Sequence, residues 1–393
     1  MRSPSLPILY RLHRRGARTV PRLHLDVVED RSKMPRRQSA HVAPPQSAKA
    51  AGLRYTACNE RGIKRVRSGK AVRYVGPSGR PIGDAATLRR IRSLVIPPAW
   101  TDVWIASDSH SHLQATGRDA RGRKQYRYHP RWREVRHQTK YERMVPFAHA
   151  LPGLRRRVER DLRATSLTRD KVVAAVVELL GKTFLRIGNN EYARTNKSFG
   201  LTTLRDGHVS IRGTELTFEF RGKSGVRHSV TFSDARLARI VKRCQDLPGQ
   251  ELFQYVDDDG RRRRVTSADV NTYLREVTGD EFTAKDFRTW AGTVMAAIAL
   301  RDEPLRSTQR ENKSVVARAI EQVAKHLGNT PTICRTCYIH PYVLECHADG
   351  SLRKKLASRR RVRGLSADEC GVLALLEGKR DWRTLLAESA RAA

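Results

Sequence analysis

The chain has 393 residues, and its 77 Lys and Arg against 40 Asp and Glu give a formal net charge of +37 at pH 7. That length predicts two domains with tails, and that charge favours a polyanionic partner, of which nucleic acid is the natural candidate. The longest apolar run, residues 292–300, is about half of the roughly 20 residues that a membrane helix requires, so we expect a soluble chain without a membrane partner.

Residues 1–51 are rich in arginine, proline and serine, and no acidic residue precedes Asp26. This composition does not favour a packed core, so we expect a disordered basic arm. A targeting peptide and a start codon placed upstream of the true one at Met34 are the alternatives.

Residues 52–130 alternate short apolar segments with turns and predict a small, mostly β domain. One short helix is expected over residues 85–94, before a pair of prolines that end it. The far edge, residues 114–128, reads QATGRDARGRKQYRY and interleaves basic with aromatic side chains. In a strand, Arg123 and Gln125 share one face, and such a strand can bind phosphates and read base edges. The alternative is a solvated basic edge strand.

Residues 131–350 predict a mainly helical lobe. Helical patterns are found over residues 131–162, 171–185, 267–276 and 285–300. Two hairpins are expected between them, one over residues 201–211 that turns at Asp206-Gly207 and one over residues 216–232. Arg186 follows the second helical pattern, Lys223 lies at the tip of the second hairpin, and Arg288 lies in the first turn of the last helix, where a bound anion would explain its placement against the helix dipole.

A helix, a turn and a second helix are predicted around residues 316–338. Apolar residues at helical spacing lead to Gly328, which ends the first helix, and Thr330-Pro331 begins the second. Asn329 therefore falls in the turn and Tyr338 at the end of the second helix. A tyrosine taken alone is more often a packing residue than a nucleophile.

The remaining residues, 351–393, predict a basic tail with a C-terminal helix that begins at Ser366 with Glu369 in a capping box. Six scattered cysteines indicate a reducing compartment rather than a disulfide framework. Cys334-x-x-Cys337 raises the question of zinc or redox chemistry, but its helical context and the lack of a second such pair lead us to predict no metal site.

Four short motifs contain the residues singled out above: FLRIGNNEYARTNKSFGLTTL at 184–204, GKSG at 222–225, KDFRTW at 285–290 and GNTPTICRTCY at 328–338. Together with a fifth, GRKQYRY at 122–128, they resemble the DNA-reading and active-site motifs of type IB DNA topoisomerases, particularly the compact poxviral and bacterial branch. The matching active-site set is Arg186, Lys223, Arg288, Asn329 and Tyr338. The resemblance covers about residues 52–350.

The resemblance implies an α+β fold, with a small β-rich N-terminal lobe and a mainly α-helical catalytic lobe that holds a small antiparallel sheet, together forming a C-shaped clamp on double-stranded DNA. It implies relaxation of supercoils by a monomer, with no cofactor, ATP or metal, in the bacterial cytoplasm at the nucleoid; organelle targeting by the N-terminal arm is the alternative. It also implies DNA contacts by Arg121, Arg123, Lys124, Gln125, Tyr126, Tyr128, Arg131 and Lys197.

In this interpretation Tyr338 attacks the phosphorus and forms a 3′-phosphotyrosyl bond, Lys223 protonates the departing 5′ oxygen, and the other three residues bind the nonbridging oxygens. Many family members have histidine where this chain has Asn329. An amide keeps a donor but carries no positive charge, so acid catalysis at this position is in doubt.

Two other functions remain open. A tyrosine recombinase shares the fold and the nucleophile, but such enzymes usually carry His-x-x-Arg where this chain has Lys285-Asp286-Phe287-Arg288. A noncatalytic basic DNA-binding protein would need the charge alone, and it predicts that Tyr338→Phe retains function.

Overall fold

The computed structural model describes residues 44–68, 71–357 and 361–378. The chain divides into two units, Met1–Gln38 and Ser39–Ala393, and every described residue belongs to the second. Most of the predicted basic arm therefore lies outside the described residues. Its last part is a short helix, α1 (Pro44–Ala50), and a turn rather than disordered chain. The reason is a small apolar cluster in which Ala48 and Leu53 pack with Trp132.

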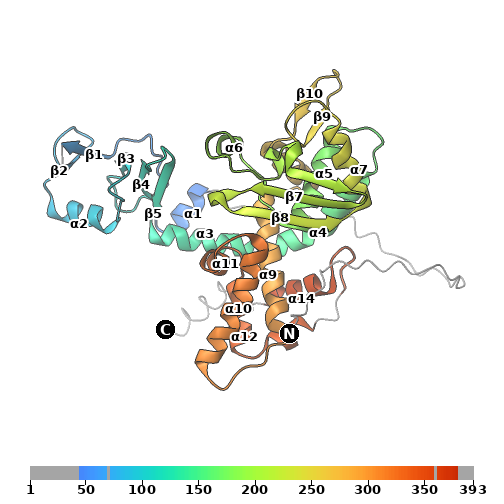
Figure 1. The fold of residues 1–393 in the computed structure, drawn as a ribbon. Coiled ribbons are helices and arrows are strands. Elements are labelled where there is room, and N and C mark those ends of the chain that lie inside the picture. The colour runs from blue at the N-terminus through green and yellow to red at the C-terminus, as the bar shows by residue number, and fades with distance from the viewer. Residues whose placement is uncertain (1–43, 69–70, 358–360, 379–393) are drawn as a thin grey trace, which may run out of the picture. The chain divides into compact units, whose positions relative to one another are not determined.

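A five-stranded antiparallel sheet follows α1 (Figure 1). Its strands are β1 (Ile63–Ser68), β2 (Ala71–Val75), β3 (Thr101–Ile105), β4 (Leu113–Arg118) and β5 (Lys124–Tyr128), in the spatial order β2-β1-β3-β4-β5. One helix, α2 (Ala85–Ser93), is capped by Asp84 and packs Ile91 into the core of this sheet. The predicted short strands and the single short helix are therefore present in this part of the chain.

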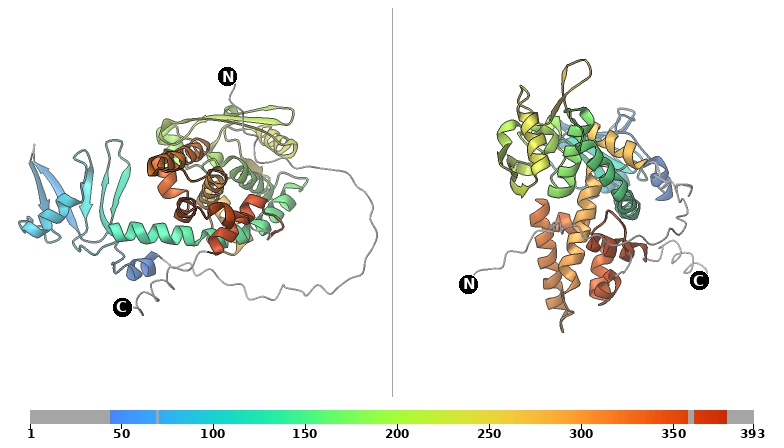
Figure 2. Two further views of the ribbon diagram at one scale, coloured as in Figure 1. Left: turned by 90° about the horizontal axis from the view of Figure 1, so that it is seen from below. Right: turned by 90° about the vertical axis from the view of Figure 1, so that its right-hand side faces the viewer.

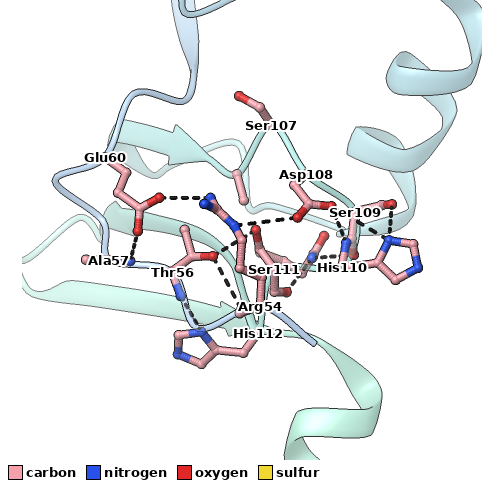
Figure 3. A network of polar contacts seen from close by, with 12 residues as sticks. Arg54, Thr56, Ala57, Glu60, Ser107, Asp108, Ser109, His110, Ser111 and His112 are labelled. Atoms are coloured by element: carbon pink, nitrogen blue, oxygen red, sulfur yellow. Dashed lines mark hydrogen bonds and ion pairs between the residues drawn. The ribbon is translucent and has the colours of Figure 1, made fainter. Parts of the chain in front are cut away.

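A polar network ties the chain before β1 to the turn between β3 and β4 (Figure 3). The Thr56 amide donates to His112 Nδ1 at 3.0 Å, and the Thr56 hydroxyl donates to Ser111 Oγ at 2.9 Å. Burial lowers the pKa of His112, which suits a neutral ring that accepts a hydrogen bond. Arg54 pairs with Glu60 at 2.8 Å on the exposed side of the same network.

The rest of the chain is mainly helical. Its helices are α3 (Pro130–Glu142), α4 (Met144–Leu162), α5 (Arg169–Thr183), α6 (Asn190–Asn196), α7 (Ala235–Gln245), α8 (Ser267–Thr278), α9 (Ala284–Arg301), α10 (Gln309–Leu327), α11 (Pro331–Cys337), α12 (Pro341–Ala348), α13 (Leu352–Leu356) and α14 (Ala367–Glu377). The helical pattern predicted over residues 131–162 is two helices that meet at Arg143. Ten of the fifteen residues of α5 are buried, and most of these ten are apolar or small.

A three-stranded antiparallel sheet, β6 (Val209–Arg212), β7 (Glu215–Arg221) and β8 (Arg227–Ser233), lies within this helical part. The hairpin predicted over residues 216–232 is confirmed as β7 and β8. The hairpin predicted over residues 201–211 is wrong. The backbone amides of Leu201 and Thr202 bind the carbonyls of Arg186 and Ile187 at 2.9 and 2.7 Å, so this segment forms short 3₁₀ turns and leaves only β6 to pair with β7. A second small ribbon pairs β9 (Gln254–Val256) with β10 (Arg262–Arg264).

The C-terminal helix α14 packs against α4 and α9, and it lies beside α9 in both views of Figure 2. It begins at Ser366 with the predicted capping box to Glu369. Its apolar side chains belong to the main core, which is why this part of the predicted tail is folded. The described chain is therefore an α+β protein in which a helical core carries one three-stranded sheet.

Candidate active site

Arg288 is the fifth residue of α9, a helix that starts at Thr283 with a capping box to Asp286. Its side chain is only 4% exposed, and its guanidinium donates to the carbonyls of Phe184 and, at 2.6 Å, Leu327. These carbonyls lie at the C-terminal ends of α5 and α10, where the helix dipoles favour a cation. Arg288 thus lies just beyond the first turn in which it was predicted, and two helix ends stabilise its charge even without a bound anion.

Arg186 follows α5 after Phe184, which ends the helix in the left-handed conformation at φ 53°. Its guanidinium donates to the amide oxygen of Asn329 and to the carbonyl of Gly328 at 3.3 Å. Burial and then the charge of Arg288 lower the pKa of Arg186. Two guanidinium groups are therefore close enough to repel each other, and the partners described for both are neutral oxygens.

Tyr338 is the residue that caps the C-terminal end of α11, and its amide donates to the Cys334 carbonyl at 2.9 Å. The Arg288 guanidinium carbon lies 5.1 Å from the centre of the Tyr338 ring, within cation–π range. Gly292 packs against the same residue: a β-carbon at that position would lie 2.7 Å from the Tyr338 carbonyl oxygen. One helix, α9, therefore supplies both the cation over the ring and the close backbone contact.

Asn329 lies in the predicted turn, after Gly328 ends α10 at φ 56°. The backbone N–H of Asn329 donates to the Ala324 carbonyl at 2.9 Å, which fixes the turn. Its side-chain oxygen faces Arg186, and its side-chain nitrogen donates to the Leu327 carbonyl at 3.4 Å. Because the side-chain nitrogen has two hydrogens, one donor is left for a phosphate oxygen.

Lys223 is exposed at the tip of the hairpin formed by β7 and β8, where Ser224 has a φ of 62°. No hydrogen bond or ion pair joins its side chain to the other described residues. The structure thus brings four of the predicted residues together, Arg186, Arg288, Asn329 and Tyr338, and leaves the fifth on the hairpin.

His228, which sequence reasoning missed, connects that hairpin to the site. A β-carbon on Gly222 would lie 2.6 Å from its ring, and one on Gly328 would lie 2.5 Å from it. The ring also stacks on Phe220 at 5.1 Å. Burial, then the charges of Arg186 and Arg288, lower the pKa of His228, so the ring is neutral where it fills this gap. The position of His228 on β8, five residues after Lys223, could have indicated that it lies near the hairpin tip. Its contact with Gly328, 100 residues away in sequence, could not be seen from the sequence.

The predicted DNA-contact residues lie on and around β5, except Lys197 at the end of α6. Asp119 accepts from Arg123 at 2.8 Å and from Gln125 at 2.9 Å, so these two side chains share a face as expected. Tyr126 and Tyr128 stack at 6.0 Å between ring centres. The others are Arg121, exposed in the preceding turn; Lys124, bonded to Cys58 Sγ at 2.9 Å; Arg131, exposed in the first turn of α3; and Lys197, which caps α6.

Cys334 is fully buried beneath the site, and burial raises the pKa of its thiol to about 11. Cys334 is therefore a protonated thiol that packs in the core, and its place in the Cys-x-x-Cys pair needs no metal or redox role. In the part of the chain that the structure describes, no three His, Cys, Asp or Glu side chains group as metal ligands would, and no helix is long and apolar enough to cross a membrane.

Comparisons with known proteins give two family matches. The eukaryotic DNA topoisomerase I catalytic core matches residues 129–360, and the bacterial DNA topoisomerase IB N-terminal domain matches residues 71–119. The DNA topoisomerase 1B of Acanthamoeba polyphaga mimivirus is 34% identical over 293 residues, 73% of this chain and 87% of that protein. The DNA topoisomerase 1B of Vaccinia virus is 24% identical over 271 residues, 66% of this chain and 81% of that protein.

Proposed function

The chain belongs to the type IB DNA topoisomerase family, and from that premise we propose that Tyr338 is the nucleophile with which it cuts and reseals one strand of duplex DNA. The observation that carries the proposal is the meeting of Arg186, Arg288 and Asn329 around Tyr338 from segments far apart in the chain. Such a meeting of cations and one phenol is what cleavage of a phosphodiester by tyrosine requires.

In the cleavage step the Tyr338 oxygen forms a bond to phosphorus while the bond from phosphorus to the 5′ oxygen breaks. The phenol gives up its proton to solvent, and the leaving oxygen receives one from Lys223. The product is a 3′-phosphotyrosyl ester and a free 5′ hydroxyl. Religation is the reverse, and because an ester is exchanged for an ester, neither direction consumes ATP.

The charge that develops on the nonbridging oxygens is bound by the guanidinium groups. Arg288 uses one donor on each of two carbonyls, which leaves three of its five N–H groups, and its Nε is buried without a partner among the described residues. Arg186 likewise keeps donors beyond those it gives to Asn329 and Gly328. Both arginines are therefore anchored before DNA binds and still have N–H groups to give to a phosphate.

Lys223 completes the set when its hairpin closes over the cleaved strand. It is exposed and lies at the tip of a hairpin whose base is held by His228, so its side chain is free to approach the 5′ oxygen.

We propose further that the β5 residues read the DNA and that the two lobes form a C-shaped clamp. We also propose that the protein acts as a monomer at the nucleoid in the bacterial cytoplasm. The net charge of +37 supports the DNA contacts, and sedimentation on and off DNA tests the monomer.

The test is relaxation of supercoiled plasmid in EDTA without ATP, by the full chain and by Tyr338→Phe. We expect the wild type to relax the plasmid and to leave a covalent adduct on Tyr338 when trapped with denaturant, and Tyr338→Phe to do neither while binding DNA with unchanged affinity. Retained relaxation by Tyr338→Phe contradicts the proposal and favours a noncatalytic DNA-binding protein. Strand exchange between paired sites would instead indicate a recombinase.

A further inference from the structure

Three successive carbonyls at the end of α11 are each bound by a side chain from another helix. The Tyr141 hydroxyl donates to the Thr336 carbonyl at 3.0 Å, and the Lys140 ammonium donates to the Cys337 carbonyl. The Thr293 hydroxyl donates to the carbonyl of Tyr338 itself at 3.2 Å. The donors come from α3 on one side and α9 on the other.

Helix ends leave their last carbonyls without partners inside the helix, and a glycine in the left-handed conformation usually helps to satisfy them. Here the capping residue is Tyr338, at φ −132° and ψ −11°, so side chains take that task instead. Thr293 is fully buried and also accepts the His340 amide at 3.0 Å. The Thr293 hydroxyl has one hydrogen to donate. The Met144 sulfur, at 3.8 Å, is a weaker acceptor for it than the Tyr338 carbonyl.

Lys140 is an unusual choice for a structural cap. Its side chain is partly buried, and this burial lowers the pKa of its ammonium to about 8. Its ammonium also lies 4.3 Å from the centre of the Tyr141 ring. A charged donor makes a stronger hydrogen bond to this carbonyl than a neutral donor would, and the carbonyl belongs to the residue before Tyr338.

We propose that Lys140, Tyr141 and Thr293 are positioning residues that hold the backbone of Tyr338 where its phenol can reach the phosphorus in line. The inference rests on the proposed role of Tyr338. Fixing three carbonyls removes backbone freedom next to the nucleophile, and misplacing a reacting group by about 1 Å costs on the order of 100-fold in rate. Since α3 begins two residues after β5, the helix that follows the DNA-reading strand is the one that holds the nucleophile.

The test uses Lys140→Met, Tyr141→Phe and Thr293→Val in the full chain, with Lys242→Met as the matched control. Lys242 is exposed on α7, and among the described residues its ammonium pairs only with Asp246, at 3.2 Å. Single-turnover cleavage of a DNA duplex gives the rate and the fraction of active enzyme, and a separate chase gives the religation rate. DNA affinity is measured on the same duplex.

We expect each of the three variants to cleave about 10-fold to 100-fold more slowly, with the full active fraction and with unchanged DNA affinity. Religation should change less than about 3-fold, because the covalent bond already holds Tyr338 in place, so the covalent fraction at equilibrium falls. A substrate with a sulfur leaving group should not restore the rate, since protonation is not the step affected. Lys242→Met should match the wild type.

Wild-type cleavage rates in Lys140→Met and Tyr141→Phe overturn the inference. So does a smaller active fraction that cleaves at the normal rate, which would mean that these residues only stabilise the fold. Failure of the inference is distinct from failure of the proposed function. An inactive Tyr338→Phe together with fully active Lys140→Met and Tyr141→Phe removes the inference alone, whereas an active Tyr338→Phe removes both.

Discussion

The indole nitrogen of Trp290 donates to Glu369 Oε1 at 3.1 Å, and this bond joins the helix that carries Arg288 to the C-terminal helix α14. Arg155 binds the same carboxylate through two nitrogens at 2.8 and 2.9 Å. Burial alone would raise the pKa of Glu369, but the hydrogen bonds and charge of Arg155 outweigh it and lower the pKa. An ionised, fully paired carboxylate thus fixes α14 against the catalytic helix.

Replacing Glu369 with alanine is therefore expected to lower the free energy of unfolding by about 1–3 kcal/mol, because it leaves the buried Trp290 N–H without its acceptor and removes the ion pair with the partly exposed Arg155. Urea denaturation measures the change. Glu345→Ala, at an exposed site on α12, is the control and should stay within about 0.5 kcal/mol of the wild type. Equal urea midpoints for Glu369→Ala and Glu345→Ala would mean that the Glu369 contacts do not stabilise the packing of α14 against α9.

The helices around the site could be predicted because their ends are marked locally. Gly328 in the left-handed conformation and Thr330 before Pro331 set the turn that holds Asn329, and these signals lie within a few residues of one another. The contacts of Arg288 could not be predicted in this way. They depend on Phe184 and Leu327, which are 104 and 39 residues away in sequence.

The family motifs identified residue types but not their partners. Arg186 and Asn329 were expected as separate phosphate ligands, and their direct hydrogen bond was not expected. Lys140 and His228 were missed because the residues that they contact, Cys337 and Gly328, lie 197 and 100 residues away in sequence. The wrong hairpin over residues 201–211 has the same cause, since its backbone partners lie at Arg186 and Ile187.

Gly292→Ala should slow cleavage although it favours the helix. Alanine in a helix interior is worth up to about 1 kcal/mol relative to glycine. The new β-carbon, however, would lie 2.7 Å from the Tyr338 carbonyl oxygen and 3.0 Å from its β-carbon, so the nucleophile must shift. We expect at least about a 10-fold loss in single-turnover cleavage with DNA affinity retained. A variant that cleaves at the wild-type rate would show that the nucleophile tolerates this displacement.

Asn329→Asp should be more damaging than Asn329→Ala. Alanine removes one phosphate donor and the acceptor for Arg186, which we expect to slow cleavage about 100-fold to 1000-fold, as loss of one transition-state hydrogen-bond donor does. Aspartate adds a negative charge beside Arg186 and repels the phosphate as well. The cleavage rates of the two variants are compared on one duplex. If Asn329→Asp cleaves faster than Asn329→Ala, Asn329 does not bind the phosphate.

The cleavage rates of Lys223→Ala and His228→Ala should both be restored by a substrate with a better leaving group at the 5′ position. Loss of a general acid costs about 10²–10⁴-fold, and a 5′ sulfur leaving group needs no proton, so it should restore much of the Lys223→Ala rate. His228→Ala frees the hairpin from Gly328 and misplaces the same lysine, so we expect a smaller loss with the same rescue. Rescue of neither variant would remove Lys223 as the acid. Rescue of Lys223→Ala alone would remove His228 as the residue that positions it.

Lys140→Met should change how stability depends on pH. In the unfolded chain the lysine keeps its proton up to its ordinary pKa of 10.5, whereas in the fold burial lowers the pKa to about 8. Between these values the unfolded state binds more protons, so the wild-type free energy of unfolding rises with pH by up to about 1.4 kcal/mol per unit relative to the variant. Below pH 8 both states hold the proton and the difference is flat. Cys337 and Asp286, which face Lys140, raise its pKa in the fold, but the effect of burial is larger. Urea denaturation of the pair at pH 7, 8, 9 and 10 measures the difference, and a constant difference across that range would show that Lys140 does not titrate as a buried ammonium.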